Sequence, residues 1–288
     1  MTVARIPVRT SPSVSAKSAV ARPLELGGRK LPRALLSLLE IRAPLEFATL
    51  VATLPTLARA PKGDGHPVLL LPGFAAGDTT LEPLRLFLRS RSYDVETWGL
   101  GKNPGFNRRY ARVIEQKVRY IHHRSGRKLS LVGWSLGGVF AFYAAHAAPE
   151  CVRTAISLGA PLRVDPDHPP APAVLALYRA LENPQGTLAH AAHSRRRAMR
   201  AAPPVPSTCV YSDSDGFVAP QQATLDGDPR NHENIRVPGS HTGLGVNLLV
   251  LWIVADRLAQ PEGKWQPFHP SGAFARAFRR LDVRDAAP

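Results

Sequence analysis

The chain has 288 residues, a length that suits one large α/β domain with insertions or at most two small domains. Lysine and arginine exceed aspartate and glutamate to give a formal net charge of +15, which favours anionic partners, but without a zinc-finger spacing or another nucleic-acid-binding motif we expect no nucleic acid partner. Two cysteines far apart in the sequence indicate neither a disulfide framework nor a cysteine-rich metal site.

Residues 1–30 contain six basic residues and one acidic residue, with scattered serines and prolines and no apolar block. This composition predicts a disordered basic arm. It also fits an organellar transit peptide, but it lacks the apolar region and the small-residue cleavage site of a secretory signal. We therefore expect a cytoplasmic protein.

Residues 31–62 form an apolar extension with mostly helical spacing. Charged residues and the prolines Pro44 and Pro55 interrupt it, so it does not supply the roughly 20 apolar residues of a transmembrane helix. We predict two amphipathic helices here. Two roles remain open for them: packing against the main domain, or lying on a membrane surface beside the basic arm, which makes the protein peripherally membrane-associated through residues 1–60.

From residue 63 to residue 260, apolar runs of strand length alternate with segments of helical spacing. The predicted strands are 66–71, 93–98, 128–132, 152–158, 207–212 and 235–237, and the predicted helices are 80–90, 108–124, 139–148 and 246–258. This alternation predicts the α/β class, with a mostly parallel central sheet covered by helices on both faces.

An insertion at residues 162–206 is rich in alanine, proline and arginine. A long excursion of this kind usually covers a site, so we predict an inserted cap or lid, with a surface elaboration as the alternative. The aromatic and basic tail, residues 261–288, is expected to pack back onto the body of the domain.

The segment Gly133-Trp134-Ser135-Leu136-Gly137 has the pattern G-x-S-x-G between a predicted strand and a predicted helix. A nucleophile elbow requires this strand, turn and helix, and its glycines keep side chains out of the close strand-to-helix contact. The Ser135 hydroxyl is then exposed at the helix N-terminus, where backbone N–H groups favour negative charge. We therefore predict that Ser135 is a nucleophile.

A serine hydroxyl needs a base to remove its proton and a third group to orient that base. Downstream of Ser135, Asp213 and Asp215 follow one predicted strand and His241 follows the last. Serine, then acid, then histidine is the chain order of α/β-hydrolases, but the spacing does not separate the two aspartates. The other nine histidines have no carboxylate or cysteine partner that suggests a metal site, and we expect them on the surface.

An oxyanion formed from an ester needs two preorganised N–H donors. Leu136, directly after the nucleophile, supplies one, and the loop Pro72-Gly73-Phe74 after the first strand of the domain supplies the other through the N–H of Phe74. The same Pro-Gly pair is also an ordinary strand-ending turn, so this assignment depends on the rest of the pattern.

From about His66 to Ala259 the chain resembles an α/β-hydrolase of the bacterial lipase and esterase group. The motifs that carry the resemblance are Leu-Leu-Leu-Pro-Gly-Phe at 69–74, Gly-Trp-Ser-Leu-Gly-Gly at 133–138, Tyr-Ser-Asp-Ser-Asp-Gly-Phe-Val at 211–218 and Gly-Ser-His-Thr-Gly-Leu at 239–244.

The resemblance implies the α/β-hydrolase fold and a catalytic triad of Ser135, Asp215 and His241 that needs no cofactor or metal. In similar lipases the acid directly precedes a Gly- or Met-Val/Ile type pair, which assigns the role to Asp215 and leaves Asp213 in a variable position. Many relatives have His-Gly where this chain has Pro72-Gly73, a departure that can alter the oxyanion loop or the choice of substrate.

The residues and the resemblance together give the hypothesis of a serine hydrolase that cleaves carboxylic esters, with a lipid-like or acyl substrate held under the 162–206 cap. Two alternatives remain. An acyltransferase would use the same acyl-enzyme, and a membrane-associated binding protein would keep the fold without the chemistry.

Overall fold

The computed structural model describes residues 25–26, 29–30, 33–163 and 201–270. Most of the predicted cap, most of the basic arm and the end of the tail therefore lie outside the described residues. Within the predicted disordered arm, β1 (Glu25–Leu26) and β2 (Arg29–Lys30) pair as a short antiparallel ladder.

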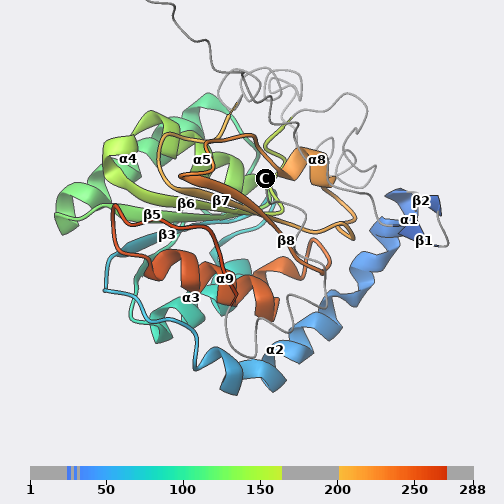
Figure 1. Ribbon diagram of the computed structural model, residues 1–288. Coiled ribbons are helices and arrows are strands. Elements are labelled where there is room, and N and C mark those ends of the chain that lie inside the picture. Colours follow the sequence, from blue (N-terminus) through green and yellow to red (C-terminus); the bar gives the residue numbers. More distant parts are fainter. Residues whose placement is uncertain (1–24, 27–28, 31–32, 164–200, 271–288) are drawn as a thin grey trace, which may run out of the picture.

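The described residues form a six-stranded sheet in the order β4-β3-β5-β6-β7-β8, and every neighbouring pair is parallel (Figure 1). The strands are β3 (Pro67–Leu71), β4 (Asp94–Glu96), β5 (Leu129–Trp134), β6 (Val152–Leu158), β7 (Ser207–Tyr211) and β8 (His232–Arg236). The chain steps from β3 to the edge strand β4 and then crosses back over β3 to β5. This reversal puts a topological switch point between β3 and β5, where the carboxyl ends of parallel strands commonly border a binding site.

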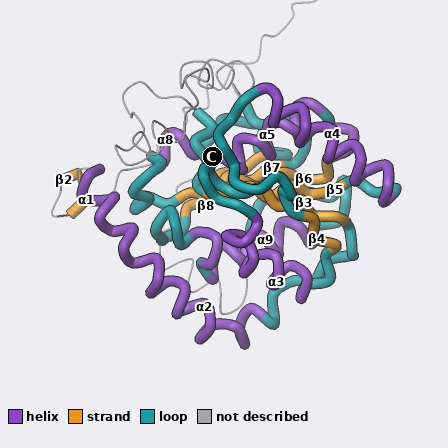
Figure 2. Tube along the Cα trace, turned by 180° about the vertical axis from the view of Figure 1, so that it is seen from behind, coloured by secondary structure: helices purple, strands orange, loops and turns teal. Residues whose placement is uncertain are grey.

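Helices cover both faces of the sheet (Figures 1 and 2). Among the described residues, the α-helices of the main domain are α3 (Glu82–Ser90), α4 (Arg108–Ser125), α5 (Leu136–Ala147), α8 (Pro220–Ala223) and α9 (Leu248–Ala259). In β3, Val68 and Leu70 share a core with α3 and α9, whereas Leu69 and Leu71 share the other core with α4 and α5. Because successive side chains of a strand point to opposite faces, burial on both faces explains the continuous apolar run of this strand. The predicted fold class is confirmed.

The N-terminal extension contains α1 (Arg33–Leu38), the 3₁₀ helix η1 (Leu39–Arg42) and α2 (Ala43–Leu57), which run along the side of the domain (Figure 1). Leu50 and Leu57 of α2 are buried in the core that α9 also lines. Both prolines lie within α2. Pro44 lies in the first turn of α2, where a missing N–H costs nothing, and Pro55 is accommodated in its last turn. Every helix in the described part of the chain is too short or too polar to span a bilayer.

The expectation that all other histidines lie on the surface is wrong for His66 and His232, which are buried. The His66 ring lies between two partners, with Nδ1 2.6 Å from Asp64 Oδ1 and Nε2 2.7 Å from Ser130 Oγ. Burial lowers the pKa of His66 to about 4, in spite of the nearby carboxylate. The imidazole is therefore neutral at pH 7, with Nδ1–H donating to Asp64.

Acidification should destabilise the fold through His66. The unfolded chain binds a proton at this histidine below its ordinary pKa of 6.5, while the folded protein takes it up only near pH 4, so stability is complete above pH 6.5 and is lost as the pH falls towards 4. We expect the free energy of unfolding to drop by about 2 kcal/mol between pH 7 and pH 5 from this group alone. Urea unfolding at the two pH values measures it. A His66→Asn variant should show a smaller drop, and an equal drop in both proteins would contradict the assignment.

Candidate active site

Ser135 lies in the sharp turn between β5 and α5, with φ of +53°, a backbone conformation that few non-glycine residues adopt. The turn is possible only because Gly133 and Gly137, two residues to either side of Ser135, have no side chains. A Cβ on Gly133 would lie 2.3 Å from the backbone of Gly137, and a Cβ on Gly137 would lie 2.0 Å from the carbonyl oxygen of Leu71. The glycines of the G-x-S-x-G pattern thus let α5 start directly over the sheet, as a nucleophile elbow requires.

Three residues from three loops meet at the carboxyl edge of the sheet. Nε2 of His241 is 2.9 Å from Oγ of Ser135, and Nδ1 of His241 is 2.7 Å from Oδ2 of Asp215. Asp215 and His241 are buried, whereas Ser135 is partly exposed. Since Nδ1–H donates to the carboxylate, the lone pair of Nε2 faces the serine hydroxyl, which is the arrangement that a general base needs.

The structure distinguishes the two aspartates that the spacing left open. Asp215 directs one oxygen at His241, and its Oδ1 accepts hydrogen bonds from the N–H groups of Phe217 at 2.8 Å and Val218 at 2.7 Å. Asp213 instead forms an ion pair with Arg236 at 2.7 Å. These two backbone donors fix the orientation of the Asp215 carboxylate, so that its other oxygen is held toward the imidazole of His241.

The surroundings of His241 make its imidazole a better base. Burial alone would lower its pKa, but the negative charge of Asp215 and the hydrogen bond to it act in the opposite direction, together with the charge of Glu40. The net result is that the pKa of His241 is raised above its ordinary value. Proton transfer from a hydroxyl to this ring is correspondingly easier.

The loop that follows β3 lies next to Ser135. A Cβ on Gly73 would be 3.2 Å from Cβ of Ser135, so this backbone passes within van der Waals distance of the serine. Asn103 holds the loop: its side chain donates to the carbonyl of Pro72 at 2.8 Å, and its carbonyl accepts the N–H of Ala75 at 2.8 Å. Phe74, predicted as an oxyanion donor, is part of this supported loop.

The second predicted donor, Leu136, is the first residue of α5. The first N–H groups of a helix have no partner within the helix. An N–H at this position, directly after the nucleophile, is therefore suited to bind a negatively charged oxygen.

Sequence reasoning missed two residues that shape the site. Gly159, directly after β6, has φ of +57°, and a Cβ there would lie 3.1 Å from Oδ2 of Asp215 and 3.2 Å from Nδ1 of His241. A side chain at this position would press on the hydrogen bond between acid and base. Trp134 donates from Nε1 to the carbonyl of His241 at 3.1 Å. In the sequence, Gly159 is a glycine that ends a buried strand and Trp134 is an aromatic residue inside the elbow. Neither feature by itself predicts a contact with the site.

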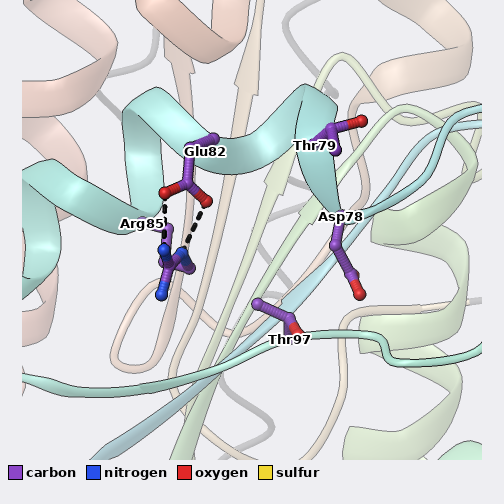
Figure 3. Close-up of a pocket in the computed structure, with 5 residues that line it drawn as sticks. All are labelled: Asp78, Thr79, Glu82, Arg85 and Thr97. Atoms are coloured by element: carbon purple, nitrogen blue, oxygen red, sulfur yellow. Dashed lines mark hydrogen bonds and ion pairs between the residues drawn. The ribbon is translucent and has the colours of Figure 1, made fainter.

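Within the described residues no three histidine, cysteine, aspartate or glutamate side chains are grouped so that they could hold a metal ion. A pocket of about 340 Å³ lies beside η2 (Asp78–Leu81) and the start of α3 (Figure 3). The residues that line it are Asp78, Thr79, Glu82, Arg85 and Thr97. An ion pair between Glu82 and Arg85 occupies one side of it, and none of Ser135, Asp215 and His241 lines it.

The parallel sheet with its switch point, the elbow after β5, and acid and histidine loops after β7 and β8 define the α/β-hydrolase fold. Solved structures agree. The chain is similar to Bacillus licheniformis lipase BlEst2, with a TM-score of 0.54 and 17% identity over 70% of this chain and 95% of that one. It is also similar to Aspergillus fumigatus lipase B, with a TM-score of 0.53 and 18% identity over 69% of this chain and 53% of that one, so the match spans about half of the fungal enzyme.

A third similar structure belongs to the study of LipS and LipT, two metagenome-derived lipolytic enzymes, and has a TM-score of 0.52 and 17% identity over 69% of this chain and 95% of that one. No protein-family model and no curated protein matches the sequence. At identities this low the likeness establishes the fold, and activity has to be argued from the site.

Proposed function

We propose that this protein is a serine hydrolase that cleaves carboxylic esters through an acyl-enzyme on Ser135. The observation that carries the proposal is the hydrogen-bonded chain from Asp215 through His241 to Ser135, with distances of 2.7 Å and 2.9 Å. The chain ends in a partly exposed hydroxyl beside the switch point of the sheet, where substrates of open α/β folds bind.

In the reaction, Nε2 of His241 takes the proton of the Ser135 hydroxyl while Oγ attacks the ester carbonyl carbon. The negative charge that develops on the carbonyl oxygen is stabilised by the N–H groups of Phe74 and Leu136. His241 then protonates the departing alcohol, and the acyl group remains on Ser135. Water, deprotonated by the same imidazole, releases the acid. Asp215 orients the ring and stabilises its protonated form.

The proposed substrates are esters with a lipid-like or other acyl chain. The support for this class is that the similar solved structures are named as lipases and lipolytic enzymes. Hydrolysis rates for p-nitrophenyl esters from acetate to palmitate, measured with and without detergent, test the proposal. Release of free acid with a preference along the series supports it, and a folded protein that hydrolyses none of these esters contradicts it. If added alcohol captures the acyl group as a new ester in place of free acid, the enzyme is an acyltransferase.

We also propose that the N-terminal extension contacts a membrane surface. Leu38, Ile41 and Leu45 recur at intervals of three and four residues and are 69%, 86% and 69% exposed. Apolar side chains at this spacing on a basic protein suit a helix that lies in the interface of an anionic bilayer. An Ile41→Ser, Leu45→Ser double variant should bind anionic vesicles about 10-fold more weakly in flotation, because two side chains no longer enter the lipid. Unchanged flotation would contradict this role.

A further inference from the structure

The N-terminal extension contacts the two loops that carry the acid and the base of the proposed triad. We call residues 212–218 the acid loop and residues 237–243 the histidine loop. Figure 1 shows the extension along the side of the domain, where it runs past the end of the sheet at β8. Polar and charged side chains of residues 37–46 form hydrogen bonds to both loops.

Glu40 of η1 joins the loops directly. Its Oε1 accepts two backbone hydrogen bonds, one from the N–H of Gly216 at 2.9 Å and one from the N–H of His241 at 2.8 Å. Its Oε2 accepts the N–H and the hydroxyl of Thr242, both at 2.8 Å. One carboxylate thus holds the residue next to Asp215 and the residue that is the base.

A second link lies beside the first. Glu46 of α2 accepts the N–H of Ser240 at 2.9 Å and its hydroxyl at 2.7 Å. Arg42 donates from Nε to Glu46 at 3.0 Å and from Nη2 to the hydroxyl of Ser214 at 2.6 Å. The pair therefore connects the acid loop at Ser214 with the histidine loop at Ser240, again one residue away from each catalytic group.

The acid loop also packs against the backbone of α1. A Cβ on Gly216 would lie 2.6 Å from the carbonyl oxygen of Leu36 and 2.8 Å from Cα of Ser37, so only glycine allows this approach. The Ser37 hydroxyl donates to the carbonyl of Gly216 at 2.9 Å. The contact is therefore close-packed as well as hydrogen-bonded.

Loops are the least rigid parts of a fold, yet the hydrogen bond between acid and base must be held in one geometry for proton transfer. Hydrogen bonds from N–H groups to an ionised carboxylate are stronger than neutral ones, so they are effective at fixing loops. We propose that residues 33–57 are a clasp that fixes the acid loop and the histidine loop relative to each other, with Glu40 as the main positioning residue. This inference rests on the proposed serine hydrolase function.

The clasp also brings charge close to the base. The charged groups near His241 are Asp215, in contact with its ring, and Glu40, in contact with its backbone, while the charges of Arg42 and Glu46 pair with each other. Burial lowers the pKa of His241, and both Asp215 and Glu40 raise it. Removing the charge of Glu40 should lower this pKa, so the acidic limb of the pH profile should move to lower pH.

The test is the rate at which a fluorophosphonate inactivates the full chain across the pH range. For Glu40→Gln we expect a plateau rate about 10- to 100-fold below wild type, because the loops lose their shared anchor, and an acidic limb at lower pH. Glu40→Asp keeps the negative charge but shortens the side chain, which no longer reaches both loops. Its plateau inactivation rate should therefore fall, while the acidic limb of its pH profile should stay near that of wild type. Glu262→Gln, which removes a carboxylate that pairs with Lys128 on the surface, is the matched control and should behave as wild type.

The inference would be overturned if the Glu40→Gln protein kept both the plateau inactivation rate and the acidic limb of wild type. Circular dichroism and Tm establish that this variant is folded. If this variant does not fold, Gly216→Ala replaces it, since its new Cβ pushes α1 away from the acid loop, and a wild-type rate in that variant has the same meaning.

Amide hydrogen exchange separates the two proposals. If fluorophosphonate does not label wild type, the proposed function fails, whereas the clasp still predicts that the N–H groups of Gly216 and His241 exchange faster in Glu40→Gln, and equal exchange overturns it.

Discussion

Replacing Ser135 by alanine should lower kcat for ester hydrolysis by about a million-fold. In the proposed mechanism the Ser135 hydroxyl attacks the carbonyl, and no other hydroxyl is hydrogen-bonded to the imidazole of His241 among the described residues. The fold should persist, because alanine and serine both carry a Cβ and are therefore strained to the same extent at the positive φ of this turn. The measurement is kcat for a p-nitrophenyl ester, together with Tm as evidence of folding.

A matched control is Ser125→Ala, at the C-terminal end of α4, which should keep wild-type activity. The mechanism would be wrong at its first step if a folded Ser135→Ala protein hydrolysed the ester at the wild-type rate. Partial activity that a serine-directed inhibitor does not remove would have the same meaning.

Replacing Asp213 or Asp215 by asparagine should change kcat very differently, which distinguishes the roles of the two aspartates. Asp215→Asn should lower kcat by about 10⁴-fold, because an amide no longer holds the imidazole in the Nδ1–H tautomer or stabilises its protonated form. Asp213→Asn should leave kcat within a few-fold of wild type, since its carboxylate pairs with Arg236 and not with His241. Parallel kinetics on the two variants, with KM recorded separately, measure the contrast.

This pair of variants is its own control, since both remove one carboxylate from the same loop. A larger loss of kcat in Asp213→Asn than in Asp215→Asn would show that the acid has been assigned to the wrong residue.

The sheet and the elbow could be predicted because their signals are local. The apolar run of β3 reflects burial on both faces, and the glycines around Ser135 reflect a turn in which a Cβ would overlap backbone. His241 could be placed by its position after the last strand. Asp213 and Asp215 could not be separated by spacing, because the difference lies in which carboxylate meets the backbone N–H groups of Phe217 and Val218.

The contacts that could not be predicted join residues far apart in sequence. Glu40 is 176 residues from Gly216 and 201 residues from His241, and nothing in an amphipathic pattern tells a glutamate that anchors a loop from one that faces solvent. His66 likewise lies 64 residues from Ser130, so its hydrogen bond to that hydroxyl could not be recognised from the sequence around it. Hydrophobic periodicity shows which face of an element is buried, but it does not show which residue will form a hydrogen bond with a polar side chain on that face.

Intact mass after exposure of the wild-type protein to a fluorophosphonate, with and without detergent, tests the central claim most directly. An activated serine reacts with this reagent, whereas the many unactivated serines of the chain do not. We expect one added phosphonyl group, mapped to Ser135 by peptide analysis, and faster labelling as His241 loses its proton. A folded protein that gains no mass under either condition, or gains it at another serine, would contradict the proposed hydrolase.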